Sequence, residues 1–338
     1  MRKGKRLIAW IMAVVMLFTI CVFGGNGTAE AAATTPVAKH GRLSVKGADL
    51  VDSKGNKFQL RGISTHGINW DVGSPYVNKK AFKTLRDDWG VNAIRLAMYT
   101  EEYNGYCSGG SQAKLRKLVD KGVGYATDLG MYAIIDWHIL SDGNPNKNKS
   151  QAKKFFTTMA KKYKNNKNVI YEICNEPNGC GWKEIKSYAT DIIKTIRKYD
   201  KKAVIIVGTP TWSQLGTDGT SNEVADSPIK GYKNIMYSLH FYASEWAHNE
   251  YLPAKVAYAR KKKLPIIVSE FGLSPASGDG AINKASADKW MKLLNKYNIS
   301  YFCWSLSNKN ESASLLKPST KKTSGWKSGD LSTAGKYI

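Results

Sequence analysis

Eight short runs rich in β-branched residues alternate with longer segments of helical periodicity, and this alternation constrains the fold more than any other feature of the chain. Such repeats predict an α/β fold with a parallel sheet, and eight of them fit a closed (β/α)8 TIM barrel better than an open sheet. The strands are predicted at 59–63, 93–97, 132–136, 169–174, 204–207, 235–240, 266–270 and 301–304. Helices between them are predicted at 79–89, 113–129, 151–163 and 185–199.

The segment from 42 to 60 alternates apolar and polar residues around the turn-forming residues 53–56, which predicts an N-terminal β-hairpin. We expect this hairpin to cap the bottom of the barrel. Residues 41–338 are therefore predicted to form a single (β/α)8 domain. No linker-like stretch follows the last strand, so we expect no second module there.

Residues 1–31 have the features of an export signal: a basic leader, an apolar stretch at 7–23, and the small-residue site Ala29-Glu30-Ala31. We expect cleavage after Ala31, a short linker at 32–40, and a secreted, extracellular protein that does not associate with a membrane. The alternative is that the N-terminal segment stays uncleaved and anchors the protein.

Lysine and arginine number 51 against 27 acidic residues, which makes nucleic acid or an anionic surface the first partner to consider. Cleavage would remove four basic residues and one acidic residue, so most of the net charge of +24 belongs to the folded part. The lysine runs at 161–162, 201–202 and 261–263 fall on predicted helix exteriors. We therefore interpret the charge as a solvated outer shell and expect no nucleic-acid partner.

Four cysteines follow the export signal, and none has the spacing of a zinc site. Cys174 and Cys303 lie in apolar runs and are predicted to be buried thiols. Cys107 and Cys180 lie in glycine-rich loops, where a disulfide between them is possible. The chain also lacks H-E-x-x-H, G-x-S-x-G and a strand-linked G-x-G-x-x-G, so we expect neither a metal nor another cofactor.

Polar and aromatic residues stand at the ends of six predicted strands. Each has an ordinary structural explanation when taken alone, because a Glu at a strand end often caps a helix and a Trp often belongs to the core. In a barrel, however, these strand ends meet at one mouth. Two carboxylates, Glu176 and Glu270, would then face a cavity lined by aromatic rings, an arrangement that suits glycoside hydrolysis.

The strand-end motifs are Arg61-Gly62-Ile63-Ser64-Thr65-His66-Gly67, Arg95-Leu96-Ala97-Met98-Tyr99, Ile135-Asp136-Trp137-His138, Tyr171-Glu172-Ile173-Cys174-Asn175-Glu176-Pro177-Asn178, His240-Phe241-Tyr242 and Ser269-Glu270-Phe271-Gly272. Together they resemble glycoside hydrolase family 5, and within it the bacterial endoglucanases grouped as subfamily 2. The resemblance runs from about residue 39 to the C-terminus.

The resemblance implies a retaining double displacement with Glu270 as nucleophile and Glu176 as acid/base. Glu176 must begin protonated, so we expect a charged neighbour and partial burial to raise its pKa. Four supporting residues are implied. Arg95 and Tyr242 would stabilise the Glu270 anion, Asn175 would bond the sugar 2-hydroxyl, and His240 would position Glu176.

The same resemblance implies a glycan cleft, with Trp304 as the floor under the sugar at the cleavage point and His138 bonded to that sugar. Phe271 and Ser305 depart from the usual family pattern, and the resemblance assigns no role to Trp246 or His248, which could lie on the leaving side. The implied substrate-binding residues are His66, Trp70, Tyr99, His138, Trp212, Trp304, Lys309 and Glu311.

The expected function is that of a secreted, monomeric endo-β-1,4-glucanase acting on cellulose-like and mixed-linkage β-glucans. One alternative is a related β-glycanase acting on mannan, xyloglucan or xylan, because the same carboxylate pair serves all of these. The other is a non-catalytic glycan-binding protein of the cell surface, against which the presence of both carboxylates argues.

Overall fold

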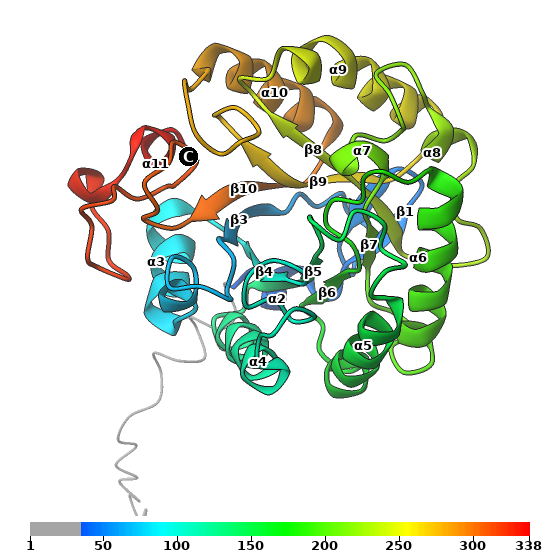
Figure 1. Cartoon of the computed structure of the whole chain (residues 1–338), viewed down its shortest axis with the longest axis horizontal. Helices are drawn as coiled ribbons and strands as arrows, with labels where there is room; N and C mark the ends of the chain where they lie inside the picture. Colours follow the sequence, from blue (N-terminus) through cyan, green and yellow to red (C-terminus); the bar gives the residue numbers. More distant parts are fainter. Residues whose placement is uncertain (1–34) are drawn as a thin grey trace, which may run out of the picture.

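The computed structural model describes residues 35–338, so the predicted signal at 1–31 lies outside the described residues. Eight parallel strands close into a barrel in the order β10-β3-β4-β5-β6-β7-β8-β9, with helices around the outside (Figure 1). The predicted TIM barrel is confirmed. Its strands are β3 (Arg61–Thr65), β4 (Ala93–Tyr99), β5 (Tyr132–His138), β6 (Val169–Glu172), β7 (Ile205–Val207), β8 (Ile235–Tyr242), β9 (Ile266–Gly272) and β10 (Tyr301–Leu306).

Several strands run two residues further toward the mouth than the sequence predicts. In β4 and β5 the pairing register continues as far as Tyr99 opposite His138. These last residues are polar or aromatic, so they do not look like strand interior in the sequence, yet the backbone ladder continues through them. The extension holds their side chains on rigid backbone at the barrel mouth.

Within residues 35–338, six long helices pack around the barrel, and the four predicted ones are confirmed within three residues at each end. Side chains of Asn78, Ser111 and Asn283 accept backbone N–H bonds at three of the helix starts, which fixes where those helices begin. No helix in the described part of the chain is long and apolar enough to span a membrane. The six helices are α3 (Lys79–Trp89), α4 (Gln112–Asp128), α5 (Lys149–Tyr163), α6 (Trp182–Arg197), α9 (Trp246–Lys261) and α10 (Lys284–Tyr297).

Short helical turns complete the structure. Two of them, α7 and α8, replace a long helix directly after β7. α2 lies inside the predicted 32–40 linker, and its Val37 N–H bonds the Gly130 carbonyl, so this segment is tied to the barrel. The short elements are α2 (Pro36–His40), η1 (Ser74–Tyr76), α7 (Pro210–Ser213), α8 (Glu223–Asp226), η2 (Ser328–Asp330) and α11 (Thr333–Tyr337).

The predicted hairpin exists, but its turn lies elsewhere. Strands β1 (Ser44–Lys46) and β2 (Asp49–Val51) pair antiparallel around Gly47, whose φ of 62° permits the tight turn. The 53–56 segment forms a separate turn, because the Asp52 carboxylate accepts two backbone N–H groups there. The prediction of the turn position was therefore wrong, while the role of the hairpin is confirmed by the cluster described next.

The barrel bottom is closed by an apolar cluster. Leu43 and Leu50 of the hairpin region pack with Phe58, Leu60 and the first residues of the barrel strands. The hairpin therefore seals the end of the barrel opposite the mouth. The cluster also contains Val204, just before β7, and the strand residues Ala93, Tyr132, Ile134, Ile170, Ile206, Met236, Ile267 and Phe302.

All four described cysteines are free thiols. Cys174 and Cys303 are buried, as predicted, whereas Cys107 and Cys180 are half-buried. The possible Cys107–Cys180 bridge does not form. Burial raises the pKa of the Cys180 thiol to about 11, so at neutral pH it stays protonated and unreactive.

Candidate active site

The mouth of the barrel opens into a cavity of about 650 Å³ that gathers the predicted site residues. Arg95 and Asn175 are fully buried just beneath it. The other twelve line the cavity: His66, Trp70, Tyr99, His138, Glu176, Trp212, His240, Tyr242, Glu270, Trp304, Lys309 and Glu311.

Glu176 follows β6 and is bonded to His240 of β8. Its Oε1 lies 2.9 Å from His240 Nδ1, and both side chains are almost completely buried. Burial raises the pKa of Glu176 to about 8, with Arg95 opposing and nearby acidic groups adding to the shift. Of the two causes that the sequence suggests, burial is thus the larger, and the charged neighbours are the smaller. A carboxyl that is still protonated at neutral pH can serve as a general acid.

Glu270, on β9, has donors on both oxygens. Arg95 Nη1 donates to Oε2 at 3.1 Å, and the Tyr242 hydroxyl donates to Oε1 at 2.7 Å. Each carboxylate oxygen thus accepts one hydrogen bond, and these bonds fix the orientation of the group. The two environments therefore differ, as a general acid and a nucleophile require: a buried, imidazole-bonded site for Glu176 and a donor-rich site for Glu270.

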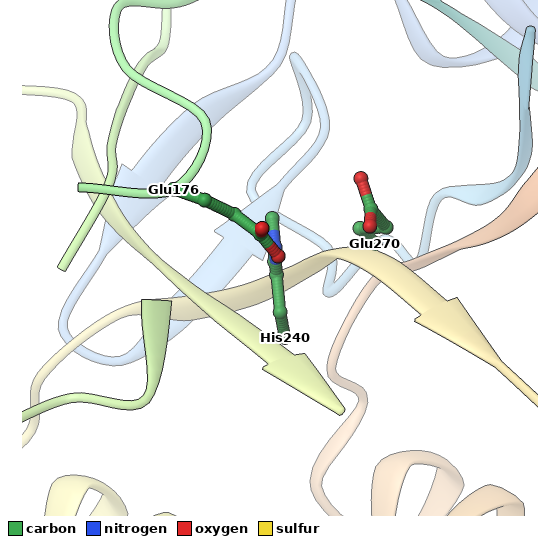
Figure 2. Close-up of side chains that lie close together, drawn as sticks. All are labelled: Glu176, His240 and Glu270. Carbon is green, nitrogen blue, oxygen red and sulfur yellow. The ribbon is translucent and has the colours of Figure 1, made fainter. Parts of the chain in front are cut away.

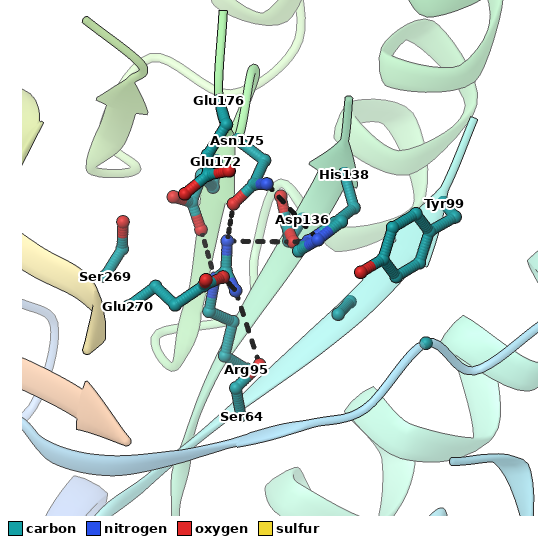
Figure 3. Close-up of polar contacts among 12 residues, drawn as sticks. Ser64, Arg95, Tyr99, Asp136, His138, Glu172, Asn175, Glu176, Ser269 and Glu270 are labelled. Carbon is teal, nitrogen blue, oxygen red and sulfur yellow. Dashed lines mark hydrogen bonds and ion pairs between the residues drawn. The ribbon is translucent and has the colours of Figure 1, made fainter. Parts of the chain in front are cut away.

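Arg95 of β4 is the centre of a buried charge cluster beneath the cavity (Figure 3). Besides Glu270, it donates through Nε to Glu172 Oε2 at 2.7 Å and lies 3.0 Å from Asp136 Oδ2. One guanidinium thus forms ion pairs with three carboxylates. Burial raises the pKa of Asp136 to about 7 and also raises that of Glu172, while Arg95 opposes both shifts.

Asp136 and Glu172 were absent from the predicted site. The signal that could have identified them is Arg95 itself, because an arginine inside an apolar strand needs buried counter-charges. Asp136 and Glu172 are the acidic residues within neighbouring strands β5 and β6.

Asn175 and His138 form a hydrogen-bonded pair over this cluster. Arg95 Nη2 donates to Asn175 Oδ1 at 2.5 Å, so the amide nitrogen faces His138 Nε2 at 3.2 Å. His138 Nδ1 lies 2.6 Å from Asp136 Oδ2. Burial lowers the pKa of His138 to about 3, so the ring is neutral and donates from Nδ1 to Asp136. The expected bond from Asn175 to a sugar hydroxyl remains a prediction, since the amide already has protein partners.

Aromatic rings form one wall of the cavity around Trp304. His138 stacks on Trp304 with ring centroids 5.2 Å apart and an interplanar angle of 18°. Tyr99 contacts His138, and Trp70 contacts Tyr99, at centroid distances of 4.1 and 4.5 Å. His66 lies 5.2 Å from Trp304. These rings come from β3, β4, β5 and β10 or the loops after them, which are neighbours in the barrel.

Charged residues extend this wall. Glu311 pairs with Lys309 at 2.5 Å and lies 3.7 Å from His66 Nε2. Trp212 stands on the opposite side, after β7, and 46 % of it is exposed. Its ring is therefore available as a platform on the side of Glu176.

The sequence did not identify every residue that lines the cavity. His248 lies on its wall and accepts the Tyr242 backbone N–H at 2.9 Å, so it supports the end of β8. Trp246 is 68 % exposed and packs edge-on against Tyr251 outside the lining. Both residues lie in the first turn of α9, where no strand periodicity indicates which side chains face the cavity. The additional lining residues are Glu102, Leu140, Gln214, Glu245, His248, Ala276, Ser277 and Gly278.

The two residues that depart from the family pattern lie behind the cavity. Phe271 stacks on Phe241 at 5.3 Å and is fully buried. Ser305 is buried and exchanges backbone bonds with the 313–315 segment. Neither side chain lines the cavity, so neither changes its wall directly.

Glu176, His240 and Glu270 lie close together, as Figure 2 shows, and each has one possible metal-ligand atom within 4.8 Å of those of the other two. Among the described residues, no other group of three or more His, Cys, Asp or Glu is so placed. Both His240 nitrogens are already bonded, to Glu176 and to the Ser269 hydroxyl. We therefore interpret the group as a hydrogen-bonded carboxyl–imidazole pair facing a carboxylate.

Comparison with known proteins gives a consistent result. Residues 51–310 match the cellulase model of glycosyl hydrolase family 5. An endoglucanase of Clostridium saccharobutylicum is 47 % identical over 99 % of this chain and 71 % of its own length. Endoglucanase A of Butyrivibrio fibrisolvens is 45 % identical over 88 % of this chain and 68 % of its own length.

Solved structures agree. The cellulase Cel5C_n superposes with a TM-score of 0.84 at 39 % identity, covering 90 % of this chain and 92 % of that one. The catalytic domain of the Thermobifida fusca endoglucanase Cel5A, solved with cellotetraose, gives a TM-score of 0.80 at 36 % identity, covering 90 % and 97 %. The chain described here therefore belongs to glycosyl hydrolase family 5, the cellulase family.

Proposed function

We propose that this glycoside hydrolase is a retaining endo-β-1,4-glucanase that cleaves internal bonds of cellulose-like and mixed-linkage β-glucans. The observation that carries the proposal is the pair of carboxyl groups, Glu176 and Glu270, with oxygens within 4.8 Å in opposite electrostatic environments. The endoglucanases among the relatives, and the cellotetraose complex of one structural neighbour, support the glucan as substrate.

In the first step, the Glu270 carboxylate attacks the anomeric carbon while Glu176 gives its proton to the departing glycosidic oxygen. Hydrogen bonds from Arg95 and Tyr242 orient the Glu270 carboxylate before the attack. The covalent bond removes the charge of Glu270. Glu176, now ionised, takes a proton from water, which attacks the glycosyl-enzyme and frees Glu270.

The carboxyl spacing supports retention. Retaining enzymes place the two carboxyl groups about 5–5.5 Å apart, whereas inverting enzymes leave about 6.5–9.5 Å for a water molecule. Oxygens within 4.8 Å of each other fit the first class.

The layout of the cavity supports internal cleavage. His66, Trp70 and Lys309 lie on one side of the carboxyl pair, on the β10–β3–β4 part of the barrel. Trp212 and Gln214 lie on the other side, after β7. A glucan chain can therefore contact the protein on both sides of the cleaved bond.

The test is a product profile on purified soluble β-glycans, combined with proton NMR of the first product. We expect a rapid fall in the viscosity of carboxymethyl-cellulose and a product that first appears as the β-anomer. An α-anomer would exclude retention, and a higher kcat/KM on mannan, xyloglucan or xylan would exclude the glucan preference. Tight binding without release of reducing sugar would favour the non-catalytic alternative.

We further propose that the protein is secreted after cleavage at Ala31 and acts as a monomer. The basic and apolar pattern of residues 1–31 supports export. N-terminal sequencing of protein recovered from the medium, with light scattering of the same sample, tests both points. A cell-bound protein that keeps residues 1–31 would establish the anchored alternative.

A further inference from the structure

Lys255, in the middle of α9, is a buried cation that takes no part in the mechanism described above. Its side chain is 3 % exposed, and its ammonium group donates to the backbone carbonyl of Gln214 at 3.0 Å and to that of Asp218. These two carbonyls are its hydrogen-bond partners within residues 35–338, and both belong to the loop that follows β7. A lysine is rarely buried without specific partners, because its charge must be taken out of water. Lys255 therefore holds this loop against α9.

The loop that Lys255 contacts begins with a turn of unusual backbone conformation. Four of the five residues from 211 to 215 have φ between 52° and 63°, in the left-handed region. Residues other than glycine rarely adopt this region, and a β-branched residue such as Thr211 is strained there. A strained turn persists only where its surroundings fix it. The four residues are Thr211, Trp212, Ser213 and Leu215.

On its inner side, the turn is fixed to the loop that carries Glu176. The Trp212 N–H donates to the Pro177 carbonyl at 3.1 Å, and the Ser213 hydroxyl donates to the Asn175 carbonyl at 2.6 Å. These two carbonyls belong to the residues on either side of Glu176. In the proposed mechanism Glu176 gives its proton to the departing oxygen, so the Trp212 ring stands on the leaving-group side of the cavity.

On its outer side, the loop is fixed to α9. Lys255 bonds it at two points, and one helical turn earlier the Tyr251 ring packs on Gly219, where a Cβ would lie 2.8 Å from the ring. Gln214, whose carbonyl Lys255 bonds, lines the cavity two residues after Trp212. A displacement of the backbone at Gln214 would therefore also move the Trp212 ring.

We propose that Lys255 is a positioning residue that fixes the leaving-side wall, Trp212 and Gln214, against which the departing segment of the glucan binds. Without the ammonium group, two carbonyls lose their donor, and the strained turn is free to relax toward an ordinary conformation. The Trp212 ring then leaves the orientation in which a sugar can stack on it. The inference rests on the proposed function, because only a glycan that is cleaved has a leaving side.

The first test compares Lys255→Met with the wild type on two substrates that differ on the leaving side. Cellohexaose places sugars there, whereas the leaving group of β-cellotriosyl fluoride is a single atom. We expect kcat/KM to fall by about tenfold on cellohexaose and to stay within about twofold on the fluoride, because only the first substrate uses the leaving-side wall. An unchanged kcat/KM on cellohexaose, or an equal fall on both substrates, would overturn the proposal.

Arg197→Met is the matched control, because Arg197 is a half-buried cation that also bonds backbone carbonyls, but at the bottom of the barrel. Its partners are the carbonyls of Asp200, Ala203 and Lys233. We expect the ratio of the two kcat/KM values to match that of the wild type. A shift of this ratio as large as that of Lys255→Met would mean that general loosening causes it. If Lys255→Met does not fold, Lys255→Gln, which retains an N–H donor, decides in the same way.

The second test is a double-mutant cycle with Trp212→Ala on cellohexaose. If Lys255 acts through the Trp212 ring, its replacement has little left to disturb once that ring is gone. We expect Lys255→Met to lower kcat/KM by at most about twofold in the Trp212→Ala background. Losses that multiply in the double variant would show that Lys255 acts elsewhere and would overturn the proposal.

Hydrogen exchange separates this inference from the proposed function, because it needs no substrate. We expect the backbone amides of residues 211–219 to exchange faster in Lys255→Met than in the wild type, with the amides of the barrel strands unchanged. A wild type that cleaves neither substrate, together with this local change in exchange, would refute the function and leave Lys255 as the residue that fixes the wall. An active wild type and a Lys255→Met variant with the wild-type substrate ratio would refute the inference alone.

Discussion

The two ends of the same eight strands have opposite chemistry. At the bottom, the first residues of the strands join an apolar cluster with the hairpin, and this cluster includes the fully buried rings of Phe302 and Tyr132. At the mouth, the strand residues nearest the cavity and those just after the strand ends hold a buried guanidinium, four carboxyl groups and three imidazoles. Apolar burial stabilises a fold, whereas buried charge costs free energy unless it is fully paired. Apolar burial at the bottom therefore stabilises the fold, and it offsets the free-energy cost of burying the catalytic charges at the mouth.

The helices extend this difference to the surface. Each long helix begins near the mouth and ends near the bottom, because it connects the end of one strand to the start of the next. Most of them carry Lys or Arg in the last turn, such as Lys161 and Lys162 in α5 and Arg260 and Lys261 in α9. Cations at a helix C-terminus are favourable, so part of the excess charge is placed by the helix dipole near the bottom, away from the substrate.

The largest expected effect is that of Glu270→Gln. The amide keeps the shape but cannot attack the anomeric carbon, so kcat should fall by about four orders of magnitude or more. Arg95 keeps two of its three carboxylates, so the melting temperature should stay close to that of the wild type. Initial rates on carboxymethyl-cellulose and thermal melts check the two parts. Near-normal hydrolysis would exclude Glu270 as nucleophile.

Arg95→Met tests the limit of this comparison, because we expect it to show that one residue at the mouth is also essential for the stability of the fold. Its removal leaves three buried carboxylates without their cation, a loss of about 3–5 kcal/mol in the free energy of unfolding at neutral pH. Their folded pKa values would then lie above the unfolded ones. The folded state would gain stability at pH 5 and lose it as the pH rises. Urea titrations at pH 5 and pH 8 measure this, and equal loss at both would contradict it.

Phe302→Ala makes the reverse test at the bottom. The Phe302 ring is fully buried and packs directly over Gly62, where a Cβ would lie 2.1 Å from the ring. Deleting it should cost about 3–5 kcal/mol of stability and leave a cavity. At a temperature where the variant is folded, kcat/KM should stay within about twofold of the wild type. A large fall in kcat/KM there would mean that the two ends are coupled.

Some features of the two ends could be predicted from the sequence alone, and others could not. The eight strands and the long helices were predictable, because strong hydrophobic periodicity is local information. The catalytic pair was predictable because both carboxyl groups stand at strand ends. Asp136 and Glu172 were not, since they reach Arg95 of β4 only through the side-by-side pairing of β4, β5 and β6, which the sequence does not show residue by residue. The turn at Gly47 was also missed, because the 53–56 residues carry an equally strong turn signal.

Glu176→Gln should sharpen the comparison by showing that the acid/base costs stability at high pH. Burial raises the folded pKa of Glu176 to about 8, above its ordinary value of 4.5. Its protonated form thus contributes stability that is fully present below about pH 4.5 and is lost as the pH rises through about 8. The variant cannot ionise, so its melting temperature should exceed that of the wild type by more at pH 9 than at pH 5.

Thermal melts at pH 5, 7 and 9 check this, with Glu250→Gln, an exposed α9 residue, as the control. The control should show no such pH-dependent gain. The same protonation requirement predicts that wild-type kcat/KM declines above about pH 8, since Glu176 must carry its proton when substrate binds. A constant rate through pH 9.5 would exclude Glu176 as the general acid.

The smallest effect on the reaction should come from the surface charge. Lys201, Lys202 and Lys261 are exposed, and they lie near the bottom of the barrel, beyond or within the last turn of α6 and α9. Changing all three to Gln should leave kcat/KM on a neutral β-glucan unchanged and shift stability by less than about 0.5 kcal/mol per site. Elution from heparin should move to lower salt, because that interaction is electrostatic. A fall in kcat/KM on the neutral glucan, in parallel with the earlier elution, would mean that the surface charge helps to capture substrate. The catalytic mouth and the charged, stabilising bottom would then not be functionally separate.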